Sequence, residues 1–214
     1  MQISIRNKPF YRGWDFYLLA SLLLLTNYPL FFGGNTTRWA FYPGLVKQGE
    51  WWRVFTGLLT HVSWYHLLLD GLPFFLVYLS LDEKRIFCRL FYIILAGAGS
   101  LLAGIWFSPL VPKVGLRGLS GITYGIAALG ALEMVFRAKK DKTDSIIGAA
   151  VFSFLLLLVA YETLTGKFPF GFLLFGMVGT PILVCHAGGI AGSVIAYAVV
   201  KTINLNLNDR MRKK

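Results

Sequence analysis

The chain has 214 residues, of which 56% are hydrophobic and only 14% are charged, and its mean hydropathy is +0.63. This composition excludes most soluble classes and is typical of a polytopic membrane protein. A formal net charge of +11 occurs in some nucleic-acid-binding proteins. Here the basic residues lie in short clusters between apolar runs, so we expect a lipid bilayer and no nucleic acid as partner.

Six apolar runs approach or exceed the length that crosses a bilayer. A helix rises ~1.5 Å per residue, so about 20 apolar residues span the ~30 Å hydrocarbon core. We therefore predict an all-α, polytopic fold of six transmembrane helices in a single domain, residues 1–214. The predicted spans are residues 16–32, 54–81, 87–107, 120–136, 146–164 and 181–200. The first has no small-residue cleavage site and is predicted to be an uncleaved span, with a signal peptide as the alternative.

The distribution of Lys and Arg predicts the topology. With the N-terminus in the cytoplasm, fifteen of the 21 basic residues fall on the cytoplasmic side and six on the far side. Six spans return the C-terminus to the cytoplasm. We therefore expect both termini to be cytoplasmic.

Two connections between the spans are more than turns. Residues 33–53 lie on the far side and are rich in Trp and Tyr, which we expect at headgroup level. Residues 166–181 are apolar but broken by Gly and Pro, and we expect a partly buried flap or re-entrant loop there. Small residues in 97–104 and 188–193 predict close contact between helices.

Polar and ionisable residues cluster at one level below the far surface. The second span carries His61, His66 and Asp70, the fourth begins at Ser120, and the sixth carries His186 in its second turn. Such groups are costly inside a bilayer, so a cluster contributed by three spans indicates a functional site.

The surroundings of Ser120 are typical of a nucleophile. A residue at a helix N-terminus lies beside unpaired N–H groups that favour developing negative charge, and a serine there needs only a base to react. Gly118 lies two residues before Ser120 and would let a substrate backbone approach closely. His66 and Asp70 are four residues apart and share a helix face.

Three interpretations of this cluster remain open at this point. In the first, Ser120 is a nucleophile, His186 its general base and His66 an oxyanion donor. In the second, the three histidines bind a metal. The H-E-x-x-H pattern is absent, however, and the spacing from His61 to His66 turns the two rings roughly 140° apart on a helix. In the third, the groups form a structural polar network or the proton relay of a transporter.

Four motifs in this order resemble the rhomboid family of intramembrane serine proteases. They are WWRVFT, HVSWYHLLLD, GLSG with a tyrosine four residues after its serine, and CHAGG. The resemblance covers roughly residues 15–203. It implies a six-helix membrane bundle that needs no cofactor and no metal, and a transmembrane protein as substrate.

By this resemblance, Ser120 and His186 would form a catalytic dyad without a third acid and cleave a peptide bond in or next to a transmembrane segment. His66 and the Ser120 amide would belong to the oxyanion hole, and Tyr124 would stack on His186. Residues 166–181 would cap the site, with the fifth span as a lateral gate. The site would open to the periplasmic or extracellular side of a bacterial inner (plasma) membrane.

Asp70 departs from the family pattern, which usually has Asn at this position. A carboxylate would repel an oxyanion, so Asp70 would either be protonated and donate, or pair with His66 and keep that ring cationic. The departure leaves open a catalytically inactive rhomboid-like protein that binds membrane-protein clients. LRGLSG and this Asp also resemble the rhombosortase subgroup, which processes C-terminal Gly-Gly sorting tails.

Overall fold

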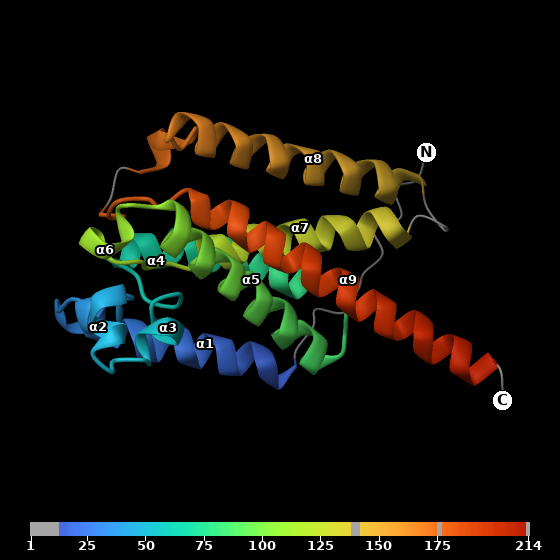
Figure 1. Cartoon of the computed structure of the whole chain (residues 1–214), viewed down its shortest axis with the longest axis horizontal. Helices are drawn as coiled ribbons and strands as arrows, with labels where there is room; N and C mark the ends of the chain where they lie inside the picture. The colour runs from blue at the N-terminus through green and yellow to red at the C-terminus, as the bar shows by residue number, and fades with distance from the viewer. Residues whose placement is uncertain (1–12, 138–141, 175–176, 213–214) are drawn as a thin grey trace.

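The computed structural model describes residues 13–137, 142–174 and 177–212, and over these residues it confirms the all-α prediction. Helices α1 and α8 lie at opposite edges of a bundle, with α5, α7 and α9 between them (Figure 1). The α-helices are α1 (Trp14–Asn27), α2 (Pro43–Lys47), α3 (Arg53–Thr56), α4 (Trp64–Ser80), α5 (Ile86–Phe107), α6 (Val111–Val114), α7 (Ser120–Arg137), α8 (Lys142–Thr165) and α9 (Val184–Arg212). The 3-10 helices are η1 (Tyr28–Phe32), η2 (Thr37–Trp39) and η3 (Gly171–Leu173).

Most predicted spans coincide with long apolar helices. Within the described residues, four stretches are long and apolar enough to cross a membrane, namely Trp14–Phe32, Ile86–Phe107, Lys142–Thr165 and Val184–Asn204. The fourth predicted span corresponds to α7, a slightly shorter apolar helix over Ser120–Phe136.

The second predicted span, 54–81, is not one helix. Helix α3 ends at Thr56, and turns and coil lead to α4, which begins only at Trp64. Ser63 is the N-cap of α4, because its side-chain oxygen accepts a hydrogen bond from the backbone N–H of His66 (3.1 Å). His61 therefore precedes the helix, and its predicted place on a helical face was wrong.

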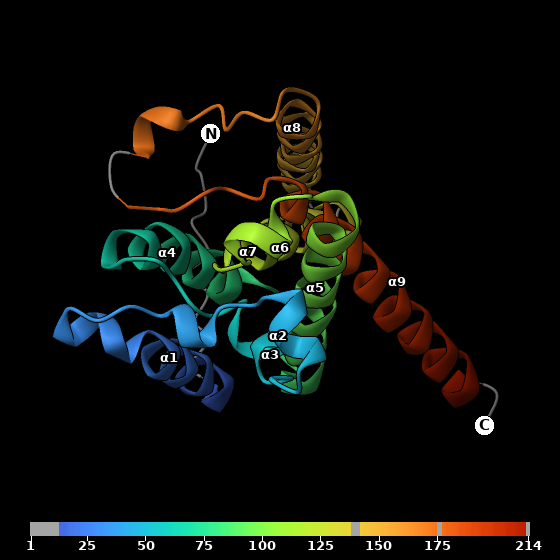
Figure 2. The same cartoon turned by 60° about the vertical axis from the view of Figure 1, so that its left-hand side comes forward.

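Glycines bring α5, α7 and α9 into direct backbone contact, as the small-residue stretches predict (Figure 2). A Cβ atom on Gly188 of α9 would overlap the carbonyl oxygen of Gly99 in α5. One on Gly189 would overlap the carbonyl oxygen of Gly121 in α7. These positions accept no side chain, so α7 and α9 are held together at the turns that carry Ser120 and His186.

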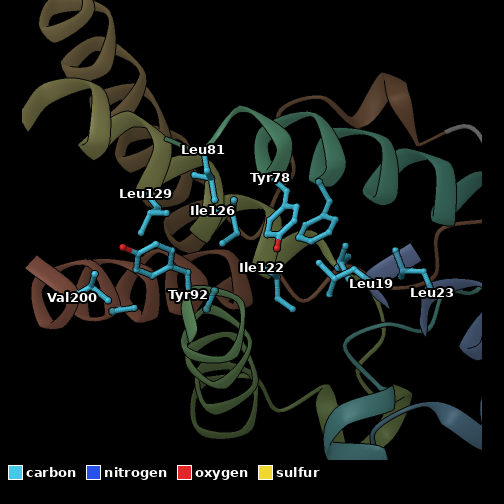
Figure 3. Close-up of a cluster of buried hydrophobic side chains, with 13 residues drawn as sticks. Leu19, Leu23, Tyr78, Leu81, Tyr92, Ile122, Ile126, Leu129 and Val200 are labelled. Carbon is cyan, nitrogen blue, oxygen red and sulfur yellow. The ribbon is translucent and has the colours of Figure 1, made fainter. Parts of the chain in front are cut away.

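An apolar cluster anchors the first turn of α7 (Figure 3). Ile122 packs there with Leu19 of α1, Tyr78 of α4 and Tyr92 of α5, all of them buried. Since Ile122 follows Ser120 by two residues, this packing fixes the position of the start of α7.

Hydrogen bonds of Arg53 and Phe41 join the segment before α4 to the rest of the first connection and to the residues before α7. The buried Arg53 guanidinium donates to the carbonyl oxygens of Thr37 (2.9 Å) and Ala40 (2.7 Å). Phe41 and Leu116 exchange two backbone hydrogen bonds of 3.1 and 2.9 Å. The long first connection is thereby joined to the residues that lead into α7.

Helix α8 has only one buried stripe. Its buried residues are Gly148, Leu155, Val159 and Glu162, which recur at helical spacing along one face. Most of the other residues of this helix from 146 onward are apolar, and most of them are exposed, as expected for a surface that faces lipid. Glu162 is the one ionisable group in the stripe.

Candidate active site

A cavity of about 280 Å³ lies where α4, α7 and α9 meet. The side chains that the sequence predicts to cluster line it together, with one exception. Those lining it are His66 and Asp70 of α4, Ser120 and Tyr124 of α7, and His186 of α9. The exception is His61, which is fully buried behind Asp70 and does not reach the cavity.

The backbone turn before α7 requires a glycine. Gly118 has φ +113°, a conformation that side chains disfavour. A Cβ atom there would lie 2.8 Å from Asp70 Oδ2 and 3.1 Å from His66 Nε2. The chain therefore passes directly over these two side chains and presents Ser120, the first residue of α7, to the cavity.

His186 is held from two sides. The Tyr124 ring stacks on the imidazole with centroids 4.0 Å apart and an interplanar angle of 9°, which is the contact that the family resemblance implies. On the other side, His186 Nδ1 lies 2.7 Å from Oε2 of Glu162. The second oxygen of Glu162 accepts a hydrogen bond from the Tyr124 hydroxyl (3.1 Å).

Glu162 is a site residue that the sequence analysis missed. The family resemblance implies a dyad with no acid, whereas the structure places this carboxylate against His186. A signal was present, because Glu162 is the only charged residue in the predicted span 146–164 and an acid inside a span needs a reason.

Asp70 acts as a hydrogen-bond acceptor. Its Oδ2 accepts from the backbone N–H of Leu119 (3.0 Å) and lies 3.3 Å from His66 Nε2 and 3.5 Å from His61 Nε2. The two imidazole centroids are 5.0 Å apart, so the prediction that these rings point away from each other was wrong. The reason is that His61 lies in coil, where helical periodicity does not apply.

The surrounding hydrogen bonds indicate where the imidazole protons lie. The Val62 N–H donates to His66 Nδ1 (3.3 Å), which leaves the His66 proton on Nε2, facing Asp70. Nε2 of His66 thus faces Asp70, as the predicted pairing of these two side chains requires. His61 Nδ1 lies 3.3 Å from Oδ1 of Asn27, which also accepts from the His61 backbone N–H (2.7 Å).

The described part of the connection 166–181 covers one side of the cavity. The described part of residues 166–181 leaves α8, reaches past α4 and returns to α9 (Figure 2). Phe168 and Leu173 contribute to the cavity wall, and the Tyr65 hydroxyl of α4 donates to the Leu173 carbonyl oxygen. Ser63 makes the same kind of bond to Met177. The expected flap is therefore present and is hydrogen-bonded to α4.

Comparison with known proteins identifies the family. The model of the Rhomboid domain matches residues 48–202, about three quarters of the chain. The chain belongs to the rhomboid family. A protein of Bacillus subtilis (strain 168), "Putative rhomboid protease YdcA", is 28% identical over 120 residues, which cover 56% of this chain and 56% of that protein. The match thus spans little more than half the length of this relative.

The matched region contains every residue that lines the cavity, and it also contains Glu162. It begins after α1 and η1, so the first span of this rhomboid chain lies outside the match. Together with the apolar helices, the family places the chain among integral membrane proteins.

The acceptor role of Asp70 predicts different effects for two substitutions in this rhomboid chain. Asp70→Leu leaves the N–H of Leu119 and Nε2–H of His66 without an acceptor, so the free energy of unfolding should fall by about 2–4 kcal/mol. Asp70→Asn keeps an acceptor oxygen of the same shape and should cost less than about 1 kcal/mol. Thermal unfolding in detergent micelles measures both. Equal losses in the two variants would contradict the acceptor role.

Proposed function

We propose that this rhomboid-family chain is an intramembrane serine endopeptidase in which Ser120 is the nucleophile and His186 the general base. The observation that carries the proposal is the shared cavity, which Ser120 enters from the N-terminus of α7 and His186 from the first turn of α9. A serine needs an adjacent base to become a good nucleophile, and an imidazole is the usual one.

The chemistry would proceed in two steps. Ser120 attacks the scissile carbonyl while Nε2 of His186 takes its proton, because Nδ1 faces Glu162. The leaving amine takes this proton, and a water activated by His186 then hydrolyses the acyl-enzyme.

The negative oxygen of the intermediate needs hydrogen-bond donors. The N–H groups in the first turn of a helix have no intrahelical acceptor, and the helix dipole adds to their attraction, so the start of α7 is a suitable oxyanion site. His66 also faces the cavity, although its Nε2 proton points to Asp70. Its predicted oxyanion role therefore stays a prediction.

The substrate would be a membrane protein cut in or next to a transmembrane segment. A cavity enclosed by apolar helices and covered by residues 166–181 suits a peptide that arrives from the bilayer. The distribution of basic residues favours an inner or plasma membrane with both termini in the cytoplasm and the site on the periplasmic or extracellular side. C-terminal Gly-Gly tails as substrates, and with them the rhombosortase subgroup, stay a prediction from the sequence.

A fluorescent fluorophosphonate, which reacts only with an activated serine, tests this proposal on the full chain in detergent. The wild type should be labelled and Ser120→Ala should not. Ser100→Ala is a matched control, because Ser100 is a buried serine that lines the same cavity, and this variant should be labelled like the wild type. A folded wild-type protein that is not labelled would overturn the proposal in favour of an inactive, client-binding rhomboid-like protein.

A further inference from the structure

We propose that Glu162 is the third member of a Ser-His-Glu triad, the residue that positions His186 and stabilises its protonated form. The inference rests on the proposed function of Ser120 and His186. It concerns a residue on α8, which has the smallest buried share of the four candidate membrane spans in the described residues.

Both carboxylate oxygens of Glu162 have a partner at the site. Oε2 lies 2.7 Å from His186 Nδ1, a distance typical of a charge-assisted hydrogen bond, and Oε1 accepts from the Tyr124 hydroxyl at 3.1 Å. Glu162 is fully buried. A carboxylate is costly to bury unless its oxygens are hydrogen-bonded, and here the base supplies one of the two bonds.

The contact determines which nitrogen of His186 can act. An acceptor at 2.7 Å keeps the imidazole proton on Nδ1, so Nε2 retains the lone pair that must take the serine proton. The imidazole becomes positively charged when it does so. A carboxylate at hydrogen-bond distance in a water-poor site offsets that charge.

Asp70, the acid that lines the cavity, cannot replace Glu162. Asp70 faces His66, His61 and the Leu119 amide instead of His186. Tyr124 contacts both Glu162 and His186, so the three side chains from α7, α8 and α9 hold one another in place.

A purely structural role for Glu162 would be to attach α8 to the bundle. The rest of the buried stripe of α8 consists of Gly148, Leu155 and Val159, so packing alone gives no reason for an acid at this position. The two roles predict different results. If Glu162 only attaches α8 to the bundle, its replacement changes the unfolding midpoint alone. If Glu162 belongs to a triad, its replacement also changes the rate of serine labelling and the hydrogen bond of the Nδ1 proton of His186.

The first test is the rate of fluorophosphonate labelling of the full chain in detergent. Glu162→Gln keeps the shape but removes the charge, and we expect labelling at least about 10²-fold slower than in the wild type. Glu162→Asp keeps the charge and should recover part of this loss. Glu133→Gln makes the same chemical change in a glutamate that binds the backbone N–H groups of Asp82 and Glu83, and it should be labelled at the wild-type rate.

The second test does not depend on activity. A strongly hydrogen-bonded Nδ1–H of His186 should give a proton resonance far downfield in the wild type, absent in His186→Ala and shifted upfield in Glu162→Gln. The chain has three histidines, so the imidazole signals are few. This resonance decides the question even if Glu162→Gln does not fold, because a wild-type protein that lacks it overturns the triad.

The outcomes separate the two proposals. If Glu162→Gln is labelled at the wild-type rate, the triad is overturned, while labelling lost in Ser120→Ala still supports the protease. If the folded wild type is not labelled at all, both proposals fail. Slow labelling in Glu162→Gln with recovery in Glu162→Asp supports the triad.

Discussion

Replacing His186 by alanine is expected to slow fluorophosphonate labelling of Ser120 by at least about 10⁴-fold. The substitution removes the proposed base, and an unassisted serine is a weak nucleophile. The N–H groups at the start of α7 remain, so we expect a small residual rate instead of none. The measurement is the labelling rate at several probe concentrations, which separates binding of the probe from its reaction.

The same substitution has a side effect on stability that the experiment must separate. His186→Ala removes one of the two hydrogen-bond partners of the buried Glu162 and leaves the Tyr124 hydroxyl, which should cost about 1–3 kcal/mol. The double variant with Glu162→Gln should regain most of that stability and none of the labelling. Ser193→Ala is the control on the same helix, since within the described structure its buried hydroxyl has no hydrogen-bond partner. Labelling of His186→Ala at near the wild-type rate would exclude His186 as the base.

Replacing Arg89 by alanine should lower the free energy of unfolding by about 3–5 kcal/mol. Arg89 of α5 is fully buried, with Nε 3.2 Å from Asp15 of α1 and Nη2 2.6 Å from the Tyr78 carbonyl oxygen of α4. Its guanidinium also lies over the Tyr78 ring, 4.0 Å from the centroid, and the Tyr78 hydroxyl donates to Asp15. Without the arginine, the carboxylate of Asp15 stays buried without its opposite charge.

Chemical or thermal unfolding in detergent micelles measures this loss. Arg85→Ala is the control, because Arg85 pairs with Glu83 at the surface and its side chain is 51% exposed, so its removal should cost less than about 1 kcal/mol. The double variant Asp15→Leu with Arg89→Met should be more stable than Arg89→Ala, since it removes both charges. If the loss of stability in the double variant equals the sum of the losses in Asp15→Leu alone and in Arg89→Met alone, the pairing is contradicted.

The sequence alone predicted the helices well, because a span depends on local composition. The runs 87–107, 120–136 and 146–164 correspond closely to α5, α7 and α8. The beginning of α4 was missed, since the apolar residues after 54 continue through turns that hydropathy does not distinguish from helix. The Ser63 cap is a local signal that could have corrected it.

Contacts between helices were predicted less completely. The positions of Ser120 and His186 along their predicted spans put both residues at the same depth in the membrane, and the structure places both in one cavity. The contact of Glu162 with His186 depends on how α8 is rotated and which helices it adjoins, which neither periodicity nor spacing specifies. The same holds for Asp15 and Arg89, which are 74 residues apart in the chain.

The glycine contact between α7 and α9 has a consequence for reactivity. Gly121 follows Ser120 directly and Gly189 lies one turn after His186, and the two backbones touch with no room for a Cβ atom. Contact between the two main chains therefore sets how far apart the backbones of Ser120 and His186 lie. Under the proposed mechanism, the entropy cost of aligning nucleophile and base would be met during folding, and a bound peptide would need only to place its own carbonyl.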